Sequence, residues 1–66
     1  MGTKFPEITA NLIGIDSNAF SIISAVREAM RRAGVDKTQI EAFTEEATSG
    51  DYDNVLQTAI KWVTVL

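Results

Sequence analysis

The sequence predicts a small α+β domain with the element order β-α-α-α-β and with its two terminal strands paired. Three observations predict this fold: an apolar/polar alternation near the amino terminus, three amphipathic segments bounded by helix-capping residues, and a β-rich run at the carboxyl end. A chain of 66 residues has room for one hydrophobic core. We therefore expect residues 1–66 to form a single small domain.

The first strand is predicted from Ile8 to Gly14, after Pro6 closes a short N-terminal lead. Successive side chains of a strand point to opposite faces, so a period of two indicates a strand with one buried face. One face of this segment carries Ile8, Ala10 and Leu12, and the other carries Thr9, Asn11 and Ile13.

The first helix is predicted to begin at residue 17 or 18 and to end at Ala33. Asp16, Ser17 and Asn18 are all favourable N-caps. At the other end, Gly34-Val35 is typical of a Schellman ending, in which a glycine adopts the left-handed conformation. The apolar face of this helix consists of Ile22, Ile23, Val26, Ala29, Met30 and Ala33.

The second helix is predicted from Asp36 through about Ser49, before Gly50. Asp36 and Gln39 have the spacing of a capping box, which satisfies backbone N–H groups at a helix start. The apolar face is narrow, with Ile40, Phe43 and Ala47, and the solvent side carries Glu41, Glu45 and Glu46.

Asp51 is predicted to cap the third helix, whose apolar face carries Tyr52, Val55, Leu56, Ala59, Ile60 and Val63. We expect helix to give way to strand near Lys61 or Trp62, because residues 62–66 are rich in β-branched and aromatic side chains. The alternative is that residues 62–66 continue the helix. Two strands alone are marginal, so oligomerisation through paired sheet edges is a means of completing the sheet.

Composition narrows the classes of function. The net charge is −3, with nine acidic and six basic residues, which disfavours duplex nucleic acid as a partner. The chain has no His and no Cys, so the commonest general base, the strongest nucleophile and the usual zinc ligands are missing. We therefore predict a protein that is not an enzyme and that has no cofactor and no metal site.

The sequence also predicts the cellular location and the oligomeric state of the protein. No segment approaches the roughly 20 apolar residues that span a bilayer, and residues 1–4 lack the apolar run of a signal peptide. We predict a cytoplasmic protein with no membrane association. A 66-residue chain without disulfides gains stability by self-association, so we expect a homo-oligomer.

Four carboxylates, Glu45, Glu46, Asp51 and Asp53, cluster around Gly50. Oxygen ligands of this kind suit Mg²⁺ or Ca²⁺, so a metal-dependent hydrolase or transferase is an alternative reading. We favour a solvated helix face for the glutamates and helix N-terminal positions for the aspartates, where negative charge is stabilising.

One stripe of the first helix combines an aromatic residue with two cations. Phe20, Ser24, Arg27 and Arg31 are spaced i, i+4, i+7 and i+11, and Asn18 lies at the helix start beside them. Guanidinium groups and aromatic rings bind anionic or planar ligands, so this stripe is the candidate binding site. In the alternative interpretation, Phe20 packs beneath the strand or in a subunit interface and Glu28 pairs with Arg31 or Arg32.

Leu12–Phe20, Glu46–Asp53 and Leu56–Thr58 running into Trp62-Val63 resemble, in this order, a family of short, uncharacterised proteins from bacteriophages and bacteria. The resemblance spans most of the chain. The family often has Asp-Gly-Asn where this chain has Asp16-Ser17-Asn18. The resemblance implies a phage or prophage accessory protein and no particular activity.

We thus expect a small non-catalytic binding protein that self-associates and, in a phage setting, engages a host component. The alternative is a protein that binds or sequesters a nucleotide or another small anionic molecule, using the N-terminus of the first helix with Arg27 and Arg31.

Overall fold

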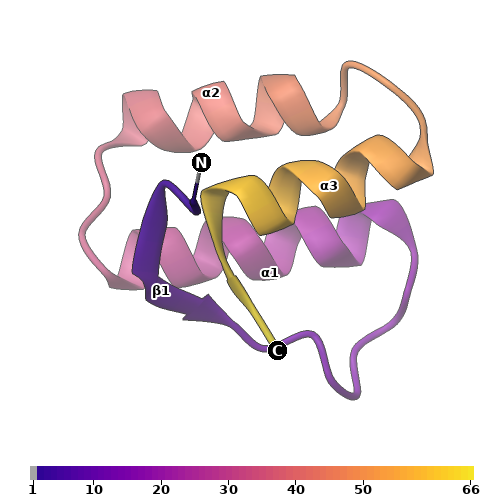
Figure 1. Ribbon diagram of the computed structural model, residues 1–66, viewed down its shortest axis with the longest axis horizontal. Coiled ribbons are helices and arrows are strands. Elements are labelled where there is room, and N and C mark those ends of the chain that lie inside the picture. Colours follow the sequence, from indigo (N-terminus) through magenta and orange to yellow (C-terminus); the bar gives the residue numbers. More distant parts are fainter. Residues whose placement is uncertain (1) are drawn as a thin grey trace.

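The computed structural model describes residues 2–66, which form three helices and two strands (Figure 1). The elements are β1 (Phe5–Ala10), α1 (Ala19–Arg32), α2 (Lys37–Ala47), α3 (Tyr52–Trp62) and β2 (Val63–Val65). This order confirms the predicted β-α-α-α-β arrangement of an α+β domain. None of the helices within residues 2–66 is long and apolar enough to cross a membrane.

The two strands lie side by side and parallel, as the only sheet of residues 2–66 (Figure 1). Thr9 is paired with Thr64 and Ala10 with Val65, and the ladder extends one step further through Leu66. The Leu66 N–H donates to the Ala10 carbonyl at 3.0 Å, and the Leu12 N–H donates to the Leu66 carbonyl at 2.9 Å. Parallel strands need a long crossover, and the three helices supply it. The predicted pairing of the terminal strands is confirmed.

The first strand lies earlier in the chain than predicted: it runs from Phe5 to Ala10 and not from Ile8 to Gly14. Beyond Ala10 the chain turns, because the Asn11 side chain accepts a hydrogen bond from the Ile13 N–H at 3.0 Å and Gly14 has a φ of +85°. The apolar residue Ile13 is therefore part of an exposed turn.

Pro6 lies inside β1 and does not close a separate lead, so this prediction is also wrong. Its carbonyl accepts a hydrogen bond from the Thr64 hydroxyl at 2.8 Å. The register is irregular between Phe5 and Thr9, where the strand bends (Figure 1). A proline and a bend are tolerated here because β1 is an edge strand.

The ends of α1 agree closely with the prediction. The Asn18 side chain accepts from the Ser21 N–H at 2.8 Å and caps the helix. The Gly34 N–H donates to the Arg31 carbonyl and the Val35 N–H to the Met30 carbonyl, both at 3.0 Å. This pair of bonds is the Schellman ending, and it depends on Gly34 at a φ of +85°.

The predictions for the ends of α2 and α3 are confirmed only in part. The α2 helix ends at Ala47, two residues before the predicted Ser49, and the Asp36 side chain makes no capping hydrogen bond, so the capping box is not formed. Asp51 caps α3 by accepting from the Asn54 N–H at 3.0 Å, as predicted. After Trp62 the chain enters β2, which rules out the alternative of a continued helix.

The three helices pack against one another, and α3 lies in front of α1 in Figure 1. Each of the five elements contributes to one core. The residues that are at most 1% exposed include Ala10 of β1, Val26 and Met30 of α1, Phe43 of α2, Ala59 of α3 and Val63 of β2. Burial of such side chains is the main favourable term in folding.

The buried face of α3 differs from the predicted one. Thr58 is 1% exposed, whereas Ile60, expected on the apolar face, is 53% exposed. Both α1 and α2 pack against α3, so its buried face is centred on Val55, Ala59 and Trp62 and includes the intervening Thr58. Similarly, Ala33 was expected on the apolar face of α1, but it is the C-cap residue and is exposed.

Candidate functional site

An open groove with a cavity volume of about 640 Å³ runs between α1 and α2. We call it the α1–α2 groove. Residues Phe20, Ser24, Arg27 and Arg31 of α1 line one side, and residues Lys37, Glu41, Thr44 and Thr48 line the other. No lining residue comes from α3 or from the strands. The groove therefore lies on the surface of the α1–α2 pair that α3 leaves uncovered.

Apolar side chains form the floor of the groove. Ile23 and Ile40 are buried at its base, and Val35 is half-buried where α1 turns toward α2. The Thr44 hydroxyl donates to the Ile40 carbonyl at 2.9 Å, and the Thr48 hydroxyl donates to the Thr44 carbonyl at 2.8 Å. These hydroxyls are therefore not free to donate to a ligand, and the groove offers apolar contact along its length.

Phe20 lies in the first turn of α1 and lines the groove with 82% of its surface exposed. The buried face of this helix is set by Ile22, Val26 and Met30, and Phe20 lies off that face. Within a single chain, the Phe20 ring therefore does not pack beneath the strand, and this part of the alternative interpretation is wrong. Aromatic residues are enriched where proteins contact partners, so an exposed ring beside a groove is a candidate contact residue.

The cations of the groove differ in their bonding. Glu28 binds Arg31 through one carboxylate oxygen and the Arg32 Nε through the other, the latter at 3.1 Å. The hydrogen bond from Arg31, followed by that from Arg32, lowers the pKa of Glu28 from its ordinary value. Lys37 lies 3.9 Å from Glu41, a weak surface pair. Within residues 2–66, Arg27 is the groove cation that makes no ion pair.

Four of the five residues singled out from the sequence thus meet in the groove, and Asn18 does not line it. The Asn18 side chain is occupied: its oxygen accepts from the Ser21 N–H, and its amide donates to Asp16 at 2.8 Å. It acts as a helix cap, which removes one of the N–H groups that a ligand at this helix end would use.

Sequence reasoning missed the contribution of α2. Lys37, Glu41, Thr44 and Thr48 repeat the i, i+4, i+7, i+11 spacing of the α1 stripe. That periodicity was present in the sequence. It could not be matched to the stripe on α1 because the sequence does not say which helix faces lie side by side.

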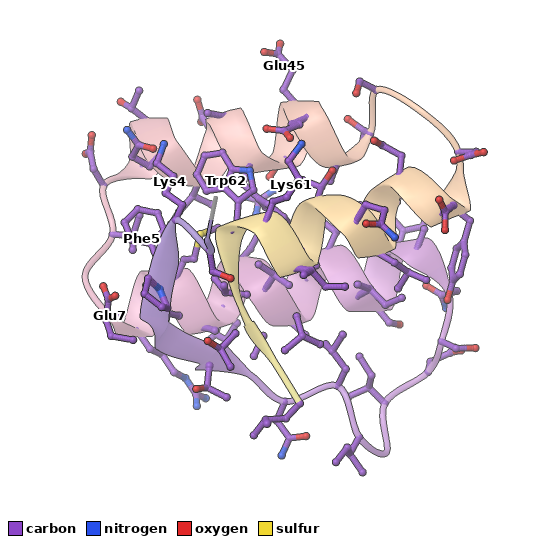
Figure 2. The ribbon with its side chains drawn as sticks, in the orientation of Figure 1. Lys4, Phe5, Glu7, Glu45, Lys61 and Trp62 are labelled. Carbon is purple, nitrogen blue, oxygen red and sulfur yellow. The ribbon has the colours of Figure 1, made fainter. Side chains whose placement is uncertain are left out.

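A second cluster joins the N-terminal segment, α2 and α3 (Figure 2). The Trp62 ring lies 5.8 Å from Phe43 and 6.1 Å from Phe5, centroid to centroid, and the Lys4 ammonium lies 4.4 Å from its centre. Glu46 accepts hydrogen bonds at 3.1 Å from the Trp62 indole N–H and from Lys61. These contacts connect the N-terminal segment, α2 and α3, so we assign the cluster a structural role.

Electrostatics of this cluster are set by Glu46. The hydrogen bond from Lys61, followed by that from Trp62, lowers the pKa of the Glu46 carboxyl from its ordinary value. Glu45, its neighbour in the chain, points away from the cluster (Figure 2). Among residues 2–66, no three acidic side chains are arranged to hold a metal ion. The carboxylates around Gly50 therefore do not come together as the metal-dependent alternative requires.

A shallower groove of about 530 Å³ lies between β1 and α1, where Ala25, Ala29 and Ala33 leave space beside the strand. Glu7 and Arg32 lie at its rim. No exposed aromatic residue lines it, and the bend in β1 interrupts the strand edge.

Comparison with known proteins finds no matching protein-family model, no similar curated protein and no similar solved structure.

Proposed function

We propose that this chain is a small non-catalytic interaction protein that binds a segment of another protein in the α1–α2 groove. The observation that carries the proposal is Phe20, 82% exposed beside an apolar floor. Burying a phenylalanine side chain contributes about 2 kcal/mol, and a few large side chains carry most of the affinity of many interfaces.

The shape of the groove favours a protein segment over a nucleotide. Small-molecule sites enclose most of their ligand and fix it with a few well-placed polar groups. The α1–α2 groove is open, and its polar side chains are half-buried or exposed. The nucleotide or anionic-ligand alternative also loses support because Asn18 already caps the start of α1. This second candidate is still supported by Arg27 and Arg31, because their guanidinium groups line the groove and can bind an anion.

The biological setting is proposed from sequence resemblance. A phage or prophage accessory protein that engages a host component is compatible with a small domain that has an exposed groove. We also propose a cytoplasmic, self-associating protein. The bend and Pro6 in β1 shorten the regular edge of that strand, so we expect self-association to use a helix surface in preference to the β1 edge.

A displayed library of random peptides tests the proposal. Peptides selected on the wild-type protein are expected to lose about tenfold or more in affinity for Phe20→Ser, since the anchor of the groove is gone. Ile13→Ser is the matched control, because Ile13 is 77% exposed but lies in a turn outside the groove. Equal binding to wild type and Phe20→Ser, or no selected peptide, would overturn the proposal.

A further inference from the structure

We propose that the segment bound in the α1–α2 groove is an acidic amphipathic helix, whose apolar side chain packs on Phe20 and whose carboxylates bind Arg27 and Arg31. This inference rests on the proposed function and specifies the chemistry of its partner. It is carried by the shape of the groove, by the charges at its rim and by the spacing between the aromatic ring and the guanidinium groups.

The shape fits a helix. Two helices flank a line of apolar side chains, and on the opposite side of the same pair α3 packs with Val55 and Ala59. The lining residues Phe20 and Arg31 are eleven residues apart along α1, which is about 16.5 Å at 1.5 Å per residue. A helical segment of about three turns covers that length, and grooves between helices are a recurrent binding mode for amphipathic helices.

The free charge in the groove is positive. Glu28 also lines the groove, but both of its oxygens are engaged, one by Arg31 and the other by Arg32. Arg27 has no ion-pair partner within residues 2–66, and Arg31 commits one guanidinium nitrogen to Glu28. A guanidinium carries five N–H donors, so both arginines can still bind a carboxylate. Lys37 and Glu41 form the remaining ion pair of the groove, and their opposite charges cancel.

The spacing sets the pattern of the partner. Arg27 lies two helical turns from Phe20 and Arg31 lies three turns from it, on the same stripe of α1. A helix lying along the groove therefore places its apolar anchor about two to three turns from its Asp or Glu residues. A basic segment would place its positive charges beside Arg27, and like-charge repulsion would weaken its binding.

A displayed library of helical peptides, with surface positions mixed among Leu, Glu, Lys and Gln, tests this partner chemistry. Selection on the wild-type protein is expected to enrich Glu over Lys, with Leu two to three turns away. Selection on Arg27→Glu/Arg31→Glu is expected to reverse this preference. Gln57→Glu is the control for added negative charge, because Gln57 is exposed on α3 and does not line the groove.

The outcomes separate this inference from the proposed function. Peptides that require Phe20 but show no preference between Glu and Lys would overturn the acidic partner and leave the groove as a binding site. Peptides that bind Phe20→Ser as well as wild type would overturn both. Thermal stabilisation by ATP that is lost in Arg27→Glu/Arg31→Glu would overturn the helix in favour of an anionic small molecule. The circular dichroism of each variant must match wild type.

Discussion

At the scale of single residues, two phenylalanines have opposite roles. Phe43 is 0% exposed and packs against Trp62, whereas Phe20 is 82% exposed. The same side chain therefore stabilises the fold in one position and is available to a partner in the other. Residue type alone does not distinguish the two cases. Their positions do, since Phe43 lies on the buried face of α2 and Phe20 lies off the buried face of α1.

Truncation of the two rings should separate these roles. Phe43→Ala is expected to lower the free energy of unfolding by about 3–5 kcal/mol, because it leaves a cavity in the core. Phe20→Ala is expected to change it by less than about 0.5 kcal/mol, as is usual for an exposed position. Urea unfolding followed by circular dichroism measures both values. A large loss of stability in Phe20→Ala would mean that the ring is buried in solution.

At the scale of the elements, the helix ends carry most of the local information. The caps of α1 and α3 follow from Asn18 and Asp51, and the end of α1 follows from Gly34. The cap of α2 does not form, although Asp36 and Gln39 have the required spacing, since spacing does not set the side-chain conformation. Local signals of this kind depend on a few neighbouring residues, which is why they can be read from the sequence.

Replacing Gly34 tests the end of α1. A Cβ at position 34 meets no atom within 4 Å, so the cost of Gly34→Ala comes from the backbone φ of +85° alone. We expect a loss of about 1–2 kcal/mol, the cost of a left-handed conformation for an L-residue. Gly2→Ala is the control, because a Cβ at Gly2 also meets no atom within 4 Å and Gly2 lies outside the helices and strands. Equal melting temperatures for the two variants would contradict this account of the Schellman ending.

At the scale of the whole molecule, the cluster around Trp62 connects parts of the chain that are far apart in sequence. The Thr3 hydroxyl donates to the Ile60 carbonyl at 3.1 Å, and the Lys4 N–H donates to the Lys61 carbonyl at 2.8 Å. Glu46 adds the link from α2 to α3. The N-terminal segment therefore satisfies carbonyl groups at the end of α3 that would otherwise lack partners.

The lowered pKa of Glu46 gives this link a pH dependence. A carboxyl group whose pKa is lower in the folded state adds stability above its unfolded pKa, near 4.5, and loses it as the pH falls through the folded value. We expect Glu46→Gln to be less stable than wild type at neutral pH and to lose less stability between about pH 5 and pH 3. Melting curves by circular dichroism across this range measure the difference.

Glu45→Gln is the matched control, because Glu45 is exposed on the same helix and points away from the cluster (Figure 2). It is expected to follow the wild-type curve. If Glu46→Gln also follows that curve, Glu46 does not stabilise the fold through its charge.

The amino-acid sequence alone sets the element order, the start and end of α1, the cap of α3 and the change from helix to strand near Trp62. These features arise from periodicity, capping residues and β-propensity, which act over a few residues. It also contains both groove stripes, one on α1 and one on α2.

Tertiary packing decides that the stripes face the same groove, that Phe20 stays exposed, and that Thr58 is buried while Ile60 is not. Packing likewise places β1 at Phe5–Ala10, because pairing with β2 selects which extended residues form the strand. Contacts between distant residues determine these outcomes, and no local pattern specifies them.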